Sequence, residues 1–263
     1  MLKIQNISKT FFPGTVNERV ALNELDLTLD EGDFITVIGS NGAGKSTLLN
    51  AVAGRLFVDT GTVLIDDKKV NKLPEYKRAR YVGRVFQDPL AGTAPNLTIE
   101  ENLSLALLRG KGRGLGRGLT KKRRDEFVEK LKSLELGLEN RLSAKVGLLS
   151  GGQRQALSLL MAGFTNPRIM LLDEHTAALD PQRAELVTGL TERIVSEGGL
   201  TTLMVTHNME QAIRLGNRLI MMHEGRIVYE ADSEMKSKLT VRDLLQEFAN
   251  IKGATLSDKA FLG

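Results

Sequence analysis

The feature that most constrains the fold of this chain is a glycine-rich turn between an apolar strand and a helix. The apolar run 34–38 leads into Gly39-Ser40-Asn41-Gly42-Ala43-Gly44-Lys45-Ser46-Thr47, and a helix is expected from Gly44 onward. This segment fits the pattern G-x-x-x-x-G-K-[ST], in which glycines let backbone amides turn around phosphate oxygens. The helix presents its positive end to the same anion. The order strand, loop, helix predicts a buried parallel strand in an α/β domain.

Two side chains of this loop have chemistry suited to a bound nucleoside triphosphate. Lys45 is expected to reach the β- and γ-phosphates, and Ser46 to offer its hydroxyl to Mg²⁺. The competing interpretation is an ordinary glycine turn that contains a lysine. The strand before the loop and the helix after it favour phosphate binding.

A second apolar strand ends in two neighbouring carboxylates. Residues 168–173 read as a strand, and Asp173 is followed directly by Glu174. In phosphate-loop enzymes the first acid helps to hold Mg²⁺, which assigns Asp173 to the metal. The second acid, Glu174, is placed to accept a proton from an attacking water. Buried strands that end in Asp-Glu are common, so this interpretation depends on the phosphate loop upstream.

The decisive motif is Leu149-Ser150-Gly151-Gly152-Gln153, at the start of an expected helix. A serine N-cap followed by two flexible glycines is the structural alternative; the functional interpretation is an anion site made by Ser150 and backbone amides. With this motif, residues 2–230 resemble the ATP-binding-cassette (ABC) ATPases, with all motifs in order. In that family two cassettes pair head to tail, and the signature of one, here Ser150, Gly151, Gly152 and Gln153, covers the ATP on the phosphate loop of the other.

The resemblance implies roles for residues that no pattern assigns alone. Gln87 is similar to the loop glutamine that contacts Mg²⁺ and senses the membrane partner, and Asp180 to the loop across the dimer interface. His207 resembles the switch histidine that contacts the γ-phosphate. Phe11 resembles the aromatic residue that stacks on adenine, with Phe12 as the alternative.

The implied fold is α/β, a phosphate-loop NTPase core with a mostly parallel sheet. An N-terminal antiparallel β subdomain and a helical subdomain, inserted at about 90–165, complete the expected single nucleotide-binding domain over 1–250. Three amphipathic helices are expected: one that begins at Thr98, one that contains Phe127 and Leu131, and one that begins at Ser150. Residues 251–263 are expected to be a short C-terminal tail.

Two positions depart from the family pattern Asp-Glu-Pro-Thr-Ser-Ala-Leu-Asp. His175 replaces the proline and Ala177 the serine. The lost hydroxyl removes a cross-dimer hydrogen bond of about 1 kcal/mol without touching the catalytic acids. A surface role for His175 is expected over an effect on the pKa of Glu174. These departures, with the run 87–95, resemble a branch of bacterial importers described as tryptophan/tyrosine or uncharacterised uptake systems.

Charge is distributed unevenly along the chain. Residues 109–124 carry eight Lys/Arg and no acid, so the rest of a chain of net charge +4 sums to −4. The segment is expected to be a solvated loop, either near anionic lipid or simply solubilising. No apolar run is long enough to span a bilayer, and the lack of cysteine excludes disulfides and thiolate zinc sites. We therefore expect a cytoplasmic protein that reaches the membrane through a partner.

The sequence thus predicts an ATPase that uses ATP and Mg²⁺ to power a membrane transporter, most simply a bacterial importer of a small solute such as an amino acid. The partners that the resemblance implies are a second cassette in a homodimer, a transmembrane permease and a substrate-binding lipoprotein. The alternative is a nucleic-acid-associated ABC-type ATPase. Only about 100 residues separate Lys45 from Ser150, which leaves no room for a coiled-coil insertion, so no nucleic acid is expected. The set Lys45, Asp173, Glu174 and His207 argues against a non-enzymatic scaffold.

Overall fold

The structure is a computed structural model that describes residues 1–111 and 118–261, with side chains up to residue 251. It divides into two compact units, one formed by residues 1–72 with 203–263 and the other by residues 73–202. Each unit is described by itself. No helix among the described residues is long and apolar enough to cross a membrane.

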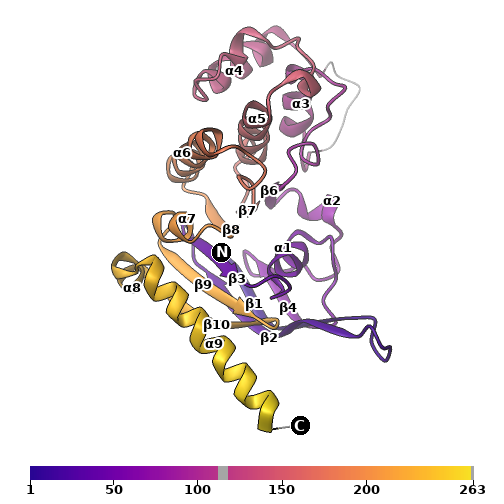
Figure 1. The fold of residues 1–263 in the computed structure, drawn as a ribbon. Helices are drawn as coiled ribbons and strands as arrows, with labels where there is room; N and C mark the ends of the chain where they lie inside the picture. The colour runs from indigo at the N-terminus through magenta and orange to yellow at the C-terminus, as the bar shows by residue number, and fades with distance from the viewer. Residues whose placement is uncertain (112–117, 262–263) are drawn as a thin grey trace. The chain divides into compact units, whose positions relative to one another are not determined.

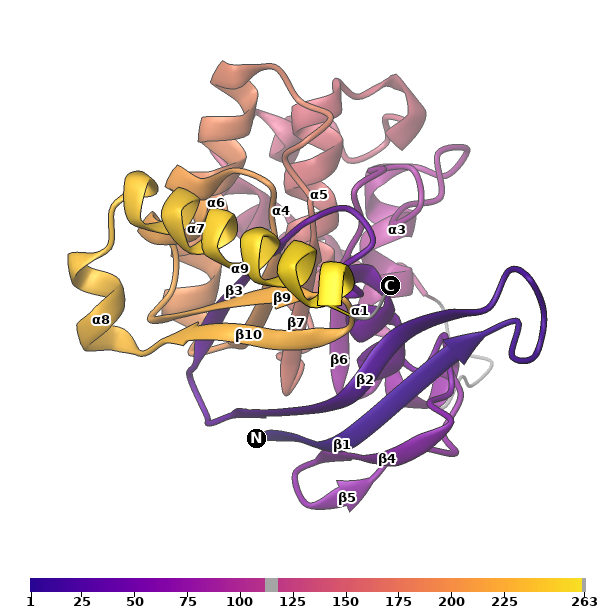
Figure 2. The same cartoon turned by 60° about the horizontal axis from the view of Figure 1, so that its bottom comes forward.

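The first unit begins with an antiparallel sheet in the order β2-β1-β4-β5 (Figure 2). Its strands are β1 (Leu2–Phe11), β2 (Arg19–Leu29), β4 (Thr60–Ile65) and β5 (Lys68–Lys69). Leu2 pairs with Leu29 and Ile4 with Leu27, and all four side chains are buried. The alternation of apolar and polar residues therefore sets the register, because a slip of one residue would expose this face. The expected N-terminal antiparallel β subdomain is confirmed.

The same unit contains the strand that leads into the glycine-rich loop. All six residues of β3 (Phe34–Gly39) are buried, and β3 pairs in parallel with β9 (Arg218–His223). β9 pairs antiparallel with β10 (Arg226–Ala231), and α1 (Lys45–Ala53) follows the loop. A strand buried on both faces needs a continuous apolar run, which the residues of β3 supply.

Three helices complete this unit: α7 (Met209–Arg214), α8 (Ser233–Lys238) and α9 (Val241–Phe261). Figures 1 and 2 show α9 alongside β9 and β10. Leu244 is fully buried in a cluster with Ile38 and Leu219, and Phe248 packs against that cluster. The first part of α9 therefore packs against this unit, and the helix continues past residue 250, where a separate tail was expected.

The second unit combines a parallel strand pair with five helices among its described residues. β6 (Val82–Val85) pairs with β7 (Ile169–Asp173), and β8 (Thr201–Val205) crosses the division between the units in sequence. The helices are α2 (Glu75–Arg78), α3 (Ile99–Leu107), α4 (Lys121–Lys132), α5 (Gly151–Gly163) and α6 (Pro181–Gly198), and short 3₁₀ turns span Leu138–Asn140 and Val146–Leu148.

The helix starts follow from the capping residues seen in the sequence. Thr98 and Glu101 form a reciprocal capping box at α3, and Asp180 caps α6 with Pro181 in the first turn. Buried Phe127 of α4 packs edge-on against Phe164, with ring centroids 5.8 Å apart. The helical block expected between the strands is present.

The basic segment is not a simple solvated loop. At its start the guanidinium of Arg109 donates to the carbonyls of Met161 and Ala162 at 3.1 Å, beside the C-terminal end of α5. At its end Arg124 lies in α4 and makes a two-point ion pair, 2.6 and 3.0 Å, with the buried carboxylate of Glu100. Both ends of the segment are therefore bonded to other residues of the same unit. Residues 112–117 lie outside the described part of the chain.

Candidate functional site

The glycine-rich loop has a backbone that other residues could not adopt. Gly39 has φ +154°, and a Cβ there would lie 2.3 Å from the carbonyl oxygen of Met222. Gly44 has φ +100°, and its Cβ would lie 2.3 Å from the carbonyl oxygen of Ala21. Both contacts are with backbone that cannot move aside. The loop pattern is therefore a steric requirement of this turn as well as a phosphate-binding signature.

Lys45 is held at the centre of the loop. Its side chain is buried, and Nζ donates to the carbonyl oxygens of Gly39 at 2.7 Å and Ser40 at 3.0 Å. The N-cap residue of α1 is Gly44, which has no side chain that could occupy the free amides of the first turn. A helix start capped in this way keeps its positive end available to an anion. Ser46 is exposed and Thr47 half-buried, one and two residues into the helix.

Contacts from two distant segments brace the loop, and sequence patterns did not indicate them. Arg19 of β2 donates to the carbonyl oxygen of Gly42 at 2.9 Å. The amide of Gly225, in the turn between β9 and β10, donates to the carbonyl oxygen of Ala43 at 3.0 Å. Asn41 stays exposed. An arginine without motif context carries no sequence signal for such a role.

The aromatic candidates lie at the end of β1, in the same unit. Phe11 is half-buried and pairs in the sheet with Arg19, the residue that contacts the loop. Phe12 is 66% exposed with φ +52°. The structure thus connects the end of β1 to the glycine-rich loop through Arg19. Either ring remains a candidate for stacking on a base.

His207 is the other candidate in this unit. It is exposed and lies two residues after the end of β8, and the amide of the preceding Thr206 donates to the carbonyl oxygen of Val37 in β3 at 3.2 Å. The Thr206 hydroxyl donates to Gln211 at 2.7 Å and accepts from the amide of Asn208 at 3.1 Å. The histidine therefore sits on a turn tied to the strand that leads into the loop.

The paired carboxylates lie at the end of β7 in the second unit. Asp173 and Glu174 are both half-buried, and Glu174 has φ +46°, a left-handed conformation that is uncommon for residues with a side chain. Non-glycine residues in this conformation concentrate at functional sites. Asp173 Oδ2 accepts from Nη2 of Arg84 at 2.9 Å. This partner of Asp173 was not foreseen from the sequence.

His175 is buried, not at the surface as expected. Its side chain is 2% exposed, and Nε2 lies 2.8 Å from the hydroxyl oxygen of Thr191 in α6. That hydroxyl donates its single proton to the carbonyl of Val187 at 2.8 Å, so Nε2 of His175 must be the donor. Burial lowers the pKa of His175 to about 4, which keeps the imidazole neutral. His175 is buried because the turn after β7 packs against α6, a contact between parts of the chain that are distant in sequence.

The signature motif begins α5 with a full capping box. The Ser150 hydroxyl accepts from the amide of Gln153 at 3.3 Å, and the Gln153 side chain accepts from the amide of Ser150 at 3.2 Å. A Cβ on Gly151 would touch Leu179 at 3.4 Å, and one on Gly152 would touch Arg183 at 3.3 Å. The start of α5 therefore lies against the loop that ends in Asp180, so two of the expected interface elements are brought together.

Gln87 follows β6 and is exposed. The residue before it, Phe86, accepts at its carbonyl oxygen from Nε2 of Gln155 at 3.0 Å. Gln155 is fully buried in α5, two residues after the signature. The loop that carries Gln87 is thus tied by one hydrogen bond to the helix that the signature begins.

The residues proposed for Mg²⁺ have suitable chemistry. Ser46 supplies a hydroxyl, Gln87 an amide oxygen and Asp173 a carboxylate, the hard oxygen donors that Mg²⁺ prefers when it is shared with nucleotide phosphates. Asp173 is only partly exposed, at 16%, and the Arg84 bond engages Oδ2. Each of these donors therefore suits a divalent cation, and a cation at Asp173 would lie beside the guanidinium of Arg84.

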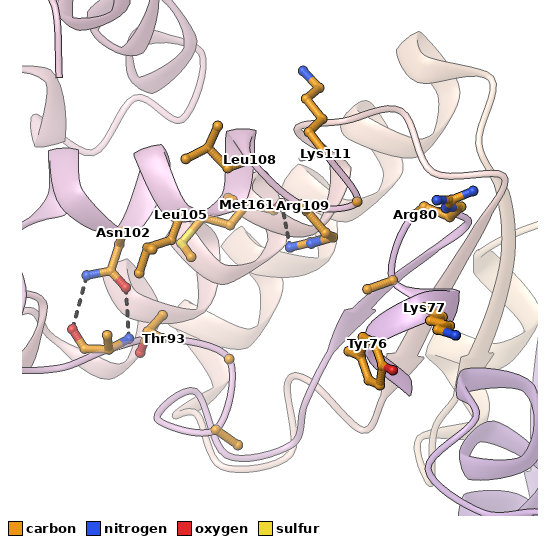
Figure 3. Close-up of a pocket in the computed structure, with 16 residues that line it drawn as sticks. Tyr76, Lys77, Arg80, Thr93, Asn102, Leu105, Leu108, Arg109, Lys111 and Met161 are labelled. Atoms are coloured by element: carbon orange, nitrogen blue, oxygen red, sulfur yellow. Dashed lines mark hydrogen bonds between the residues drawn. The ribbon is translucent and has the colours of Figure 1, made fainter. Parts of the chain in front are cut away.

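A groove of about 730 Å³ lies in the second unit (Figure 3). Exposed Tyr76, Lys77 and Arg80 line one side, and Leu105 with Met161 lines another, as Figure 3 shows. None of the described residues that line the groove is acidic. The arrangement suits an apolar surface flanked by negative charge.

Comparison with known proteins gives concordant matches. Residues 22–177 match the family described as ABC transporter. A tyrosine transport ATP-binding protein of Clostridioides difficile (strain R20291) is 46% identical over 249 residues, covering 94% of this chain and 98% of the relative. A spermidine/putrescine import ATP-binding protein of Bacillus cereus is 33% identical over 227 residues, covering 86% of this chain and 64% of the relative.

Solved structures agree. A dimeric ATP-binding cassette in a post-hydrolysis state, bound to ADP and phosphate, superposes with a TM-score of 0.76 at 34% identity, covering 89% of this chain and 99% of that chain. A nucleotide-free cassette from an ABC transporter gives a TM-score of 0.73 at 26% identity, covering 90% and 93%. The expected α/β phosphate-loop fold is confirmed.

Proposed function

Because this chain belongs to the ABC transporter family, we propose that it is the ATP-hydrolysing subunit of a membrane importer for a small solute. The observation that carries the proposal is the match over nearly the full length of both chains to a tyrosine transport ATP-binding protein. The transported solute is then an aromatic amino acid such as tyrosine. On this proposal the chain acts at the cytoplasmic face of the membrane.

Nucleotide binding is assigned to the first unit. The buried ammonium of Lys45 and the amides of residues 39–47 hold the phosphates, and Phe11 stacks on adenine. Ser46, Gln87 and Asp173 would hold Mg²⁺, which would neutralise charge on the phosphates. His207 contacts the γ-phosphate from the turn after β8.

Hydrolysis requires a water aligned on the γ-phosphorus and a group that accepts its proton. Glu174 is the assigned base, because it follows the metal carboxylate directly and is held in a left-handed turn. The signature residues Ser150 to Gln153 and Asp180 act on the nucleotide of a second copy of the chain. ATP then closes two copies on each other, and hydrolysis separates them.

The groove beside α3 is the assigned docking site for a transmembrane permease. Its exposed Tyr76 and Leu105 offer an apolar surface, and Lys77, Arg80 and Lys111 flank it with positive charge. A short cytoplasmic helix with acidic side chains is complementary to this lining. A substrate-binding lipoprotein outside the membrane completes the importer.

The function is tested by uptake of labelled solute. Cells that produce the complete transporter should accumulate tyrosine with the wild-type chain and fail to do so with Glu174→Gln. Spermidine serves as the competing solute, since a second relative is named for its import. Uptake of spermidine but not tyrosine would overturn the solute assignment, and uptake unaffected by Glu174→Gln would overturn the motor function.

Docking is tested separately. Lys77→Glu with Arg80→Glu should reduce co-purification of the permease and leave ATP hydrolysis by the isolated chain near the wild-type rate. Lys121→Glu with Lys122→Glu, which reverses two exposed charges in α4, is the matched control. Equal loss of the permease with both variants would contradict the assignment of the groove.

A further inference from the structure

The carboxylate of Asp173 accepts a hydrogen bond from the guanidinium of Arg84, and the sheet register explains why. β6 and β7 pair in parallel with Arg84 opposite Leu171. Side chains two residues apart on a strand share a face, so Asp173 lies on the face of Leu171 and of Arg84. Nη2 of Arg84 donates to Oδ2 at 2.9 Å, and the two side chains are only 9% and 16% exposed. The pair is therefore fixed by neighbouring strands and largely shielded from solvent.

The guanidinium has a second contact that leads toward Gln87. Its Cζ lies 4.7 Å from the ring centroid of Phe86, the residue before Gln87. The carbonyl oxygen of Phe86 is in turn held by buried Gln155 at 3.0 Å. Stacking of a guanidinium on an aromatic face remains favourable when its ion pair is weakened. The guanidinium of Arg84 can therefore keep its contact with the Phe86 ring when another cation binds Asp173.

We propose that Arg84 competes with the divalent cation for the Asp173 carboxylate and so sets the Mg²⁺ concentration that nucleotide binding requires. The inference rests on the proposed function, which assigns Asp173 to Mg²⁺. Arg84 acts on the metal through Asp173, as a positioning residue. The competition arises because the guanidinium of Arg84 and the divalent cation both bind the carboxylate of Asp173.

The size of the effect follows from the geometry. A cationic side chain within about 4–6 Å of a carboxylate changes the affinity of that carboxylate for a proton by roughly tenfold or more, and a competing metal cation should be affected to a similar extent. Salt screens exposed charges much more than partly buried ones, and this pair is mostly shielded. Removal of the guanidinium should therefore lower the half-saturating Mg²⁺ by about tenfold.

The test is a Mg²⁺ titration of the binding of a fluorescent ATP analogue to the full chain. Arg84→Met, which keeps an unbranched apolar side chain without the charge, should shift the half-saturating Mg²⁺ down. Arg84→Lys, which keeps the charge, should stay near the wild-type value. Arg141→Met is the matched control, because it removes one exposed positive charge from the same unit without touching Asp173.

The background variant Asp173→Asn isolates the pair. If Arg84 acts through Asp173, then Arg84→Met should produce no further shift when Asp173 is already Asn. An unchanged or raised Mg²⁺ requirement for Arg84→Met would overturn the inference. Weaker nucleotide binding at every Mg²⁺ concentration would also overturn it, since that result means that Arg84 binds phosphate. Failure of the wild-type chain to bind ATP with Mg²⁺ would instead count against the proposed function.

Discussion

Substituting Thr191 by valine tests the buried contact that holds the turn after Glu174. Valine keeps the shape of threonine but removes the hydroxyl that accepts from Nε2 of His175 at 2.8 Å. The imidazole N–H is then left buried without its partner, because His175 is only 2% exposed. An unsatisfied buried donor costs about 1–3 kcal/mol. For a chain of this size each kcal/mol lowers the melting temperature by about 2–4 °C, so a loss of roughly 2–12 °C is expected.

The assay is thermal unfolding followed by circular dichroism at neutral pH, where the lowered pKa of His175 keeps the ring neutral. Thr191→Ser retains the hydroxyl and should stay close to the wild-type melting temperature. His175→Leu should make the cost of Thr191→Val much smaller, because no imidazole donor then remains to be stranded. The reasoning would be refuted if Thr191→Val melted within about 1 °C of the wild type, or if the two substitutions were simply additive.

Three further predictions follow from the site, the buried lysine and the basic segment. Glu174→Gln and His207→Ala should bind ATP normally but lose turnover, by about 10²–10⁴-fold for Glu174→Gln, whereas Lys45→Ala should weaken ATP binding itself. Nucleotide titrations and steady-state hydrolysis rates distinguish these outcomes. Wild-type turnover in Glu174→Gln would exclude Glu174 as the base. Burial lowers the pKa of Lys236, whose ammonium donates to Thr36 and to the carbonyl of Arg218, to about 8. Between pH 8 and the usual lysine pKa of 10.5, the unfolded chain therefore binds more protons than the folded chain. The free energy of unfolding of the wild type, relative to that of Lys236→Met, should rise with pH in this range. Urea titrations that show a flat or falling difference would contradict this prediction. Arg124→Gln should lower the melting temperature more than Lys122→Gln, because only Arg124 pairs with buried Glu100, and equal melting temperatures would show that the ion pair is not stabilising.

Elements whose physics is local could be predicted from the sequence. The turn of residues 39–47 requires glycine because positive φ and close backbone contacts exclude a side chain, and that requirement is written into the sequence pattern. The strands β3 and β7 are continuous apolar runs, and the starts of α3 and α6 carry their capping residues. The family resemblance followed from this turn together with the motif at Ser150–Gln153 and the order of the motifs along the chain.

Only the tertiary structure decided which residues from distant segments meet. His175 was expected at the surface because one histidine beside a carboxylate has no periodicity to show burial, and its partner Thr191 lies on another element. Arg84 reaches Asp173, 89 residues further along the sequence, because β6 and β7 are neighbouring strands. Arg109 and Arg124 look like members of one solvated basic run, yet each has an anchor elsewhere in its unit. Such contacts depend on strand order and helix packing, which long-range burial sets and local sequence patterns do not record.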